Sequence, residues 1–456
     1  MMPITLQTIA VITNGRLYGK NISISSISID TRKAKKGSLF IALQGKNYDA
    51  HNFIHNAINA GCACCVVNKP LSIGFPHLVV KDTRIALENL SVWFRKKSKA
   101  RIVAITGSSG KTSVKEMTAA ILQQCGKTLY THGNLNNALG VPITLLRLRP
   151  IHEYAVIELG AQTKGEITYT SDLIQPDSVL INNISVSHLE GFETIEGIAQ
   201  GKGEIFNALS INGTAIINSD SNDWINWQLL LHQQNIWRFS LHKKQDSDFY
   251  SSNIISSIHG TRFILHSPAG SVEIILQVLG EHNIANALAS SALALSIGAP
   301  LSAISYGLNN FKGIEGRLFP VMLNKNKLLI DDSYNANMGS MISAINFLKT
   351  MPGYRVLIVG DIKELGSNAD KYHAQIGFMI NATSIEKVLS IGTLSYHISH
   401  NSGVGEHFCD LTTLAARSCE LLILHHQITI LVKGSRSMSM EQIVRILQEQ
   451  DVCLFT

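Results

Sequence analysis

The residues best suited to chemistry form the loop Thr106–Thr112, which reads TGSSGKT and follows the apolar run Ile102–Ile105. Glycines in such a loop let backbone N–H groups converge on phosphate oxygens, and a helix beginning after the loop adds partial positive charge. The general phosphate-loop pattern has a glycine where Ile105 stands, so this loop is a variant. Lys111 can reach the β- and γ-phosphates, and the Thr112 hydroxyl can bind magnesium. The loop therefore predicts nucleotide binding by Gly107, Ser108, Ser109, Gly110, Lys111, Thr112 and Ser113.

Two further apolar runs end in groups that could bind a metal ion. Glu158 ends the run that begins at Tyr154, and His188 lies shortly after Asn182, which ends a third run. The carboxyl ends of parallel strands meet at one edge of a sheet, where phosphate-binding folds place a magnesium ligand. This pattern favours a functional role for both residues. The alternatives are that Glu158 is a strand-end charge facing solvent and that His188 is an ordinary surface histidine.

Several other polar residues occupy positions typical of a site, although each has a simpler interpretation. Lys202 lies on a predicted helix over 194–209 and, taken alone, is typical of a surface lysine. Asn283 opens a predicted helix, where its amide could contact adenine or merely cap the helix. Arg317 and the polar run Asp331–Asn337 flank a buried strand, which is a common position for ligand contacts.

The chain length of 456 residues predicts two to four domains. Alternating short apolar runs and helical patterns indicate an α/β fold with mostly parallel sheets. We expect a small α/β domain at residues 1–82, a central parallel-sheet domain at 83–312 and a second α/β domain at 313–456. A β-rich segment is expected over 237–278 in the central domain, followed by a helix over 280–296.

Composition narrows the class of protein further. The chain is 45% hydrophobic and 16% charged with a formal charge of +6, and its densest basic group, at 95–101, is typical of a solvated helix end. The seven cysteines form no framework or zinc pattern, which favours reduced thiols. Without a signal-peptide pattern or a membrane-length apolar run, the sequence predicts a cytoplasmic protein that binds neither nucleic acid nor membrane.

Taken together, the motifs resemble those of the Mur ligases, in particular the members that add D-alanyl-D-alanine to UDP-N-acetylmuramoyl-tripeptide. The similarity covers all parts of the chain, through the patterns Asp30-Thr31-Arg32, Gly133–Asn137, His188–Phe192, Gly203–Phe206, Asp332–Asn337, Gly360-Asp361 and Glu364–Gly366. The resemblance implies a UDP-substrate domain, a central ATP-binding domain and a C-terminal Rossmann-like domain. It also implies ATP-dependent amide-bond formation in peptidoglycan precursor synthesis, by a monomer.

The resemblance assigns roles residue by residue. Lys202, fourteen positions after His188, would be carbamylated, which turns an ammonium into a carboxylate-like ligand for Mg²⁺. One Mg²⁺ would bind Thr112 and Glu158, and a second His188 and carbamylated Lys202, so that Lys111, Glu158, His188 and Lys202 form the catalytic set. Asn283, Arg317 and Asp332 would contact ATP, and the substrate contacts would be Asp30, Thr31, Arg32, Asn134, Asn136, Asn137, Tyr334 and Asn335.

The chain departs from the family pattern at several positions, which affect local loop geometry and substrate contacts. These are Thr31, Ala50, Gln162-Thr163, Glu193-Thr194 and Met338, none of which is a presumed metal or phosphate ligand. Three alternatives remain open from sequence: a sister ligase that adds another amino acid, a folylpolyglutamate synthetase, and a non-catalytic nucleotide-binding relative. The asparagine run at 134–137 argues against the first two, and joint retention of the catalytic set argues against the third.

Overall fold

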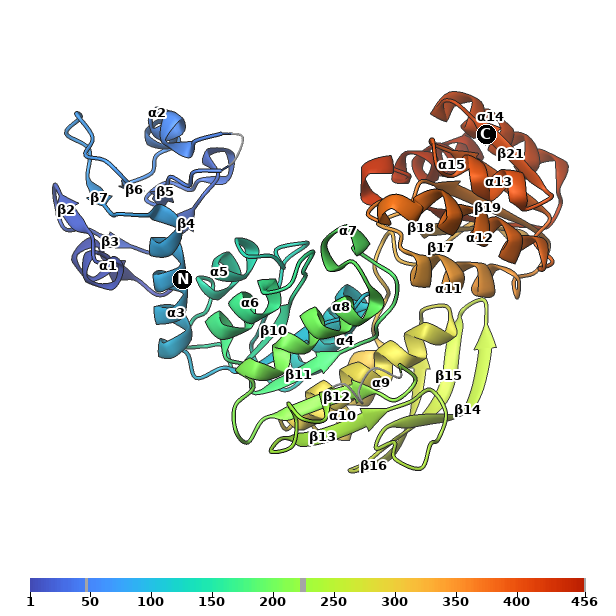
Figure 1. Cartoon of the computed structure of the whole chain (residues 1–456), viewed down its shortest axis with the longest axis horizontal. Coiled ribbons are helices and arrows are strands. Elements are labelled where there is room, and N and C mark those ends of the chain that lie inside the picture. The colour runs from blue at the N-terminus through green and yellow to red at the C-terminus, as the bar shows by residue number, and fades with distance from the viewer. Residues whose placement is uncertain (46–47, 222–226, 455–456) are drawn as a thin grey trace.

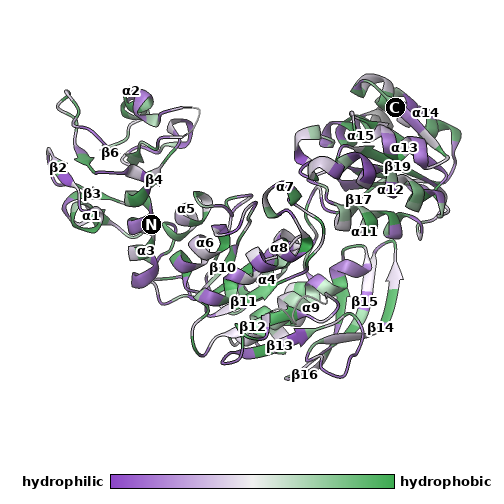
Figure 2. Cartoon of the chain, viewed as in Figure 1, coloured by the Kyte–Doolittle hydropathy of each residue, from purple (hydrophilic) through white to green (hydrophobic). Residues whose placement is uncertain are grey.

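The computed structural model describes residues 1–45, 48–221 and 227–454. Three α/β units follow one another along the chain, coloured from blue through green and yellow to red in Figure 1. Apolar residues gather in the strands and on the inner faces of the helices (Figure 2). Within the described ranges, no helix combines the length and apolar character needed to cross a bilayer.

The N-terminal unit is built on a five-stranded sheet of order β2-β7-β6-β5-β4, in which only β2 is antiparallel to its neighbour. The run over 22–29, whose residue types predict one strand, forms two short strands instead, and β1 and β2 were not predicted. The elements are β1 (Ile4–Thr5), α1 (Leu6–Thr13), β2 (Arg16–Tyr18), β3 (Ser23–Ile24), β4 (Ile27–Ser28), η1 (Thr31–Lys33), β5 (Leu39–Ile41), η2 (Ala50–Phe53), α2 (Ile54–Asn59), β6 (Cys64–Val67) and β7 (His77–Val79).

Helix α3 (Thr83–Lys97) connects the first unit to the second. It begins where predicted, because the Asp82 carboxylate accepts hydrogen bonds from the N–H groups of Arg84 and Ile85. Its apolar face, which includes Leu87 and Phe94, packs into the core of the N-terminal unit. Figure 1 shows α3 running from that unit down beside α5 (Gly140–Leu145) and α6 (Glu166–Ile174) of the next, so it packs against both units.

The central unit is a six-stranded, wholly parallel sheet of order β13-β12-β11-β8-β10-β9. Each face carries its own apolar core, as expected for a parallel sheet covered on both sides. Its first elements are β8 (Arg101–Thr106), α4 (Lys111–Leu122), β9 (Thr128–Tyr130), α5 (Gly140–Leu145), β10 (Tyr154–Glu158), α6 (Glu166–Ile174), β11 (Ser178–Ile181), α7 (Leu189–Phe192), α8 (Ile195–Gly203), η3 (Glu204–Ala208) and β12 (Thr214–Asn218).

The predicted β-rich segment is confirmed with one correction. Strand β13 (Asn235–Phe239) extends the parallel sheet beside β12, because its residues pair in register with 214–218. Only β14 (Tyr250–Ser257), β15 (Gly260–Ser267) and β16 (Gly270–Leu276) form a separate antiparallel sheet. Helices α9 (Glu281–Ser296) and α10 (Leu301–Asn309) then pack against α4 in the same core.

The C-terminal unit is a second six-stranded sheet, of order β17-β18-β22-β19-β20-β21, with only β17 antiparallel. Apolar runs over 327–330, 355–359, 387–391 and 428–432 predict four of these strands, whereas β17 and β21 at the two edges were not predicted. The elements are β17 (Phe319–Asn324), β18 (Lys327–Asp332), α11 (Met338–Leu348), β19 (Tyr354–Gly360), η5 (Gly366–Asn368), α12 (Ala369–Asn381), β20 (Lys387–Ile391), α13 (Tyr396–Asn401), β21 (Gly405–Phe408), α14 (Leu411–Leu424), β22 (Ile428–Lys433), η6 (Arg436–Met438) and α15 (Glu441–Leu454).

The buried carboxylate of Asp361 holds this unit together after β19. It accepts hydrogen bonds from the backbone N–H groups of Leu394 and Ser395 at 2.9 and 2.8 Å, and from the Lys363 ammonium at 3.0 Å. The substitution Asp361→Ala leaves these donors without an acceptor, and we expect it to lower the free energy of unfolding by about 3 kcal/mol. Urea unfolding measures this loss; Asp370→Ala, which removes an exposed carboxylate on α12, is the control. Equal midpoints for the two variants would contradict the assignment.

Candidate active site

The phosphate loop has the local structure that its glycines predict. Gly107 and Gly110 have φ angles of 147° and 78°, which L side chains rarely adopt. A Cβ atom on Gly110 would lie 2.4 Å from Nδ2 of Asn182 and 2.6 Å from Oδ1 of Asn286. The Lys111 ammonium folds back over the loop and donates to the Gly107 carbonyl at 2.7 Å. The loop is therefore tightly enclosed, and Lys111 bridges it from the first turn of α4.

Asparagine side chains brace the loop from below. The N–H groups of Ser108 and Ser109 donate to the backbone oxygen and Oδ1 of Asn183, at 2.9 and 2.8 Å. Asn182 donates from Nδ2 to the Ser109 carbonyl and to Oδ1 of Asn286. Asn286 in turn donates to Oδ1 of Asn283 at 3.0 Å. Asn283 thus belongs to a chain of amides that ends at the phosphate loop, in addition to lining the cavity described below.

Glu158 ends β10 at the edge of the sheet where the phosphate loop begins, as predicted. Its side chain is buried, with 2% of the residue exposed. Oε1 accepts a hydrogen bond from Nδ2 of Asn136 at 2.8 Å, whereas Oε2 has no hydrogen-bond partner among the described residues. An unpartnered buried carboxylate oxygen is costly unless a cation accompanies it, and this oxygen therefore fits a metal ion.

Lys202 is buried in α8, so the interpretation as a surface lysine, based on the residue alone, is wrong. Only 1% of it is exposed, its ammonium lies 5.7 Å from the ring centroid of Phe192, and none of the described carboxylates forms an ion pair with it. Burial and, secondarily, the positive charge of Lys111 hold the pKa of Lys202 well below its usual value. The environment therefore favours a neutral amine over an ammonium.

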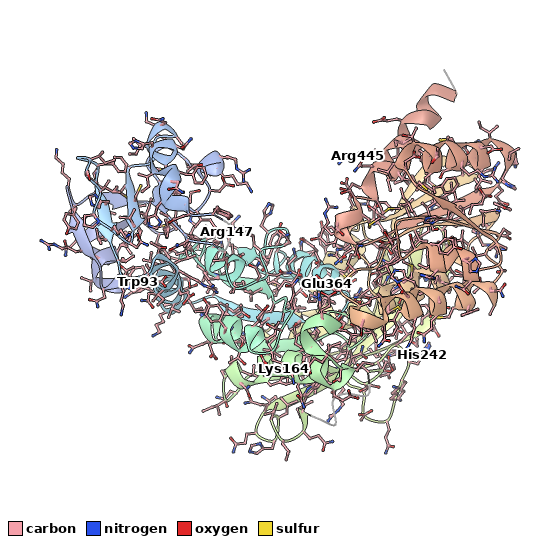
Figure 3. All side chains as sticks on the ribbon, turned by 45° about the horizontal axis from the view of Figure 1, so that its top comes forward. Trp93, Arg147, Lys164, His242, Glu364 and Arg445 are labelled. Carbon is pink, nitrogen blue, oxygen red and sulfur yellow. The ribbon has the colours of Figure 1, made fainter. Side chains whose placement is uncertain are left out.

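His188 and the C-terminal unit meet through Glu364, which Figure 3 labels at the junction of the two units. His188 has a φ of 52°, and its Nδ1 lies in close contact with Oε2 of Glu364. The Leu189 N–H donates to the Glu364 carbonyl at 3.1 Å. Gln162, an atypical residue in the family pattern, donates from Nε2 to Oε1 of Glu364 at 3.2 Å. The orientation of His188 thus depends on a residue that lies beyond the central unit.

Other residues of the C-terminal unit reach the phosphate loop directly. Arg317 donates from Nη2 to Oγ1 of Thr112 at 2.8 Å and stacks on the ring of Tyr334, with 4.4 Å from Cζ to the ring centroid. Asn337, which caps α11, donates to the Ser108 carbonyl at 3.1 Å. Asp332 pairs with the buried ammonium of Lys433 at 2.7 Å. The two sheets therefore present their carboxyl edges to one shared space.

That space is a cavity of about 2000 Å³ between the central and C-terminal units. It is lined by most of the predicted site residues: Ser108, Ser109, Gly110, Lys111, Thr112, Ser113, Asn134, Asn136, Asn137, Glu158, His188, Asn283, Arg317, Asp332, Tyr334 and Asn335. Gly107 and Lys202 lie behind its wall. Asp30, Thr31 and Arg32 lie apart from it in the N-terminal unit, where the Arg32 guanidinium pairs with the Asp30 carboxylate at 2.9 Å.

Four further residues shape the cavity without having been assigned a role from sequence. They are Asn183, Asn337, Glu364 and Lys433. Lys433 is the last residue of β22, and the other three lie two to five residues beyond the end of a strand, so position was an available signal. Their hydrogen-bond and ion-pair partners lie up to 229 positions away along the chain, so no local pattern could have indicated which residues they contact.

Comparisons with known proteins agree with this arrangement. Residues 23–106, 105–294 and 316–436 match the descriptions "Mur ligase family, catalytic domain", "Mur ligase middle domain" and "Mur ligase, glutamate ligase domain". The UDP-N-acetylmuramoyl-tripeptide–D-alanyl-D-alanine ligases of Escherichia coli strain K12 and Haemophilus influenzae are 54% and 44% identical, over 99% of this chain and 100% of theirs. A crystal structure of MurF from Acinetobacter baumannii superposes with a TM-score of 0.93 at 35% identity, over 98% of this chain and 99% of that one. The chain belongs to the Mur ligase family.

Proposed function

We propose that the chain is an ATP-dependent ligase that joins D-alanyl-D-alanine to UDP-N-acetylmuramoyl-tripeptide in peptidoglycan precursor synthesis. The observation that carries this proposal is the convergence of the phosphate loop, His188 and Glu158, with its unpartnered oxygen, around one cavity. Full-length relatives with this activity in their names support the choice of substrates. Both the nucleotide-linked substrate and ATP are consistent with a cytoplasmic enzyme.

The reaction needs ATP because a carboxylate does not condense with an amine in water unaided. Attack of the terminal carboxylate of the tripeptide on the γ-phosphorus gives an acyl phosphate and ADP. The free amine of D-alanyl-D-alanine then attacks the acyl carbon, phosphate leaves, and the amine loses a proton. Lys111 holds its ammonium over the phosphate loop, where it offsets negative charge that develops on the transferred group.

The residues around Glu158 fit the two magnesium ions that the family resemblance implies. Thr112 and the free Oε2 of Glu158 supply hard oxygen ligands for one ion. His188 and Lys202 serve the second, provided that Lys202 is carbamylated, and its burial supports this because only a neutral amine adds carbon dioxide. When bound, magnesium neutralises phosphate charge and orients the transferred group.

The remaining predicted contacts distribute the substrates over three domains, at 1–82, 83–312 and 313–456. Asp30, Thr31 and Arg32 bind the uridine nucleotide, and Asn134, Asn136 and Asn137 contact the peptide along the cavity wall beside Glu158. Asn283, Arg317 and Asp332 contact ATP. Tyr334 and Asn335 face the incoming dipeptide from the C-terminal domain. Since all these groups come from one chain, we propose a monomer.

The first test concerns the substrates. ADP release in the presence of UDP-N-acetylmuramoyl-tripeptide should rise strongly when D-alanyl-D-alanine is added, because the acyl phosphate turns over only when an amine captures it. Single amino acids and folate substrates serve as controls for a sister ligase and a folylpolyglutamate synthetase. ADP release that is indifferent to the dipeptide would refute the proposed acceptor.

The second test concerns Lys202. The substitution Lys202→Ala should lower kcat by at least about 100-fold, because it removes a proposed metal ligand. A short carboxylate such as acetate should restore part of the activity, since it can occupy the vacated space as the missing oxygen ligand. Lys164→Ala, on the exposed side of the same domain, is the control. Full activity without acetate would rule out the carbamate.

A further inference from the structure

Lys115 is a buried lysine on α4 that the proposed mechanism does not use. It lies one helical turn after Lys111, and none of its surface is exposed. Its ammonium donates to the Thr131 carbonyl at 2.9 Å and pairs with Oε1 of Glu116 at 2.6 Å. The ring centroid of Tyr130 lies 5.8 Å away. Lys115 therefore fastens α4 to the end of strand β9.

Packing alone does not explain a lysine at this position. Desolvation of an ammonium is unfavourable, and apolar residues of similar volume are often equally or more stabilising in a core. The neighbouring buried positions of α4 are filled in that way, by Val114, Met117 and Ile121. The ammonium is thus more consistent with a directional contact than with filling of space.

The partner of Lys115 leads directly to Glu158. Thr131 is fully buried, and its Oγ1 accepts a hydrogen bond from the Glu158 N–H at 3.0 Å. The Thr131 N–H donates to the Val156 carbonyl at 3.0 Å, which fixes Thr131 to strand β10. A few residues later the same segment supplies Asn136, whose Nδ2 holds Oε1 of Glu158. Both the backbone and the side chain of Glu158 are therefore held by the segment that Lys115 anchors.

We propose that Lys115 is a positioning residue that sets the distance between the two halves of the first magnesium site. One half, Thr112 with Lys111, stands at the start of α4, and the other half is Glu158 on β10. Lys115, on the same helix as the first half, is linked to the second half through Thr131, which bonds both Lys115 and Glu158. The role rests on the proposed function in one respect, because it assumes that Thr112 and Glu158 hold magnesium alongside a nucleotide.

The test measures ADP binding by calorimetry, with and without Mg²⁺, for Lys115→Met and Thr131→Val. Methionine keeps the length of the side chain without its charge, and valine keeps the shape of threonine without Oγ1. We expect the gain in ADP affinity that Mg²⁺ provides to fall about 10- to 100-fold in each variant, which is the usual effect of removing an outer-shell partner of a metal ligand. Affinity for ADP without Mg²⁺ should stay within about 3-fold of wild type, since the phosphate loop is intact.

Two controls separate positioning from a general loss of structure. Lys164→Met removes an exposed lysine of the same domain, which donates to Gln200, and should leave both affinities unchanged. The double variant of Lys115 and Thr131 should lose little more than either single variant, because the two residues act in series. If Lys115→Met does not fold, Thr131→Val still tests the link from Thr131 to Glu158 on which the inference rests, and a gain from Mg²⁺ equal to that of wild type in this variant overturns it.

Three results would overturn the inference. The first is that Mg²⁺ raises the ADP affinity of the variants as much as that of wild type. The second is that the variants lose the same factor of ADP affinity with and without Mg²⁺. The third is that the losses of the two single variants add up in the double variant. Because no peptide substrate takes part in ADP binding, failure of the proposed ligase reaction would appear only in the separate assay of ADP release. The two proposals can therefore fail independently.

Discussion

Concentration of positive charge in a buried site is the physical constraint on which the rest of the structure depends. Burial lowers the pKa of Lys111 and of Lys202, and each cation is further disfavoured by a positive neighbour: Arg317 for Lys111, and Lys111 for Lys202. At Lys111, the attraction to the Glu158 carboxylate is larger than the repulsion from Arg317, and burial is the main cause of the lowered pKa. A bound polyanionic nucleotide, and the carbamate that we propose at Lys202, would both offset this positive charge.

The arrangement of the two sheets explains how so many charges can meet without unfolding the protein. Strands β8, β10 and β11 end at the cavity from the central domain, and β18 and β22 end there from the C-terminal domain. Glu158, Asp332 and Lys433 are the last residues of buried strands, and the apolar cores around those strands hold the three charged side chains in place. The bonds from Arg317 to Thr112 and from Asn337 to Ser108 then make the position of the C-terminal domain part of the site itself.

The sequence predicted those features that local patterns determine. Short apolar runs before Gly107, Glu158 and Asn182 indicated buried parallel strands, and their polar ends indicated a common edge. Strands such as β17 and β21 were missed because they lie at sheet edges, where half-exposed residues break the apolar pattern. The burial of Lys202 could not be predicted from the sequence, because the residues beside it in α8 include Gln200, Gly201 and Gly203 and form no apolar run. The contact of His188 with Glu364 depends on how two domains pack, which cannot be predicted from the spacing of residues along the sequence.

Asparagine side chains, rather than charged side chains, hold the phosphate loop and Glu158 in position. An amide offers both a donor and an acceptor and adds no net charge, so it can brace a loop without altering the electrostatic balance. Asn182, Asn183 and Asn286 support the phosphate loop in this way, and Asn136 supports Glu158. A carboxylate at any of these positions would compete for the cations, and a lysine would add to their repulsion. Charged side chains such as Lys111 and Glu158 thus face the cavity, while neutral amides determine where they stand.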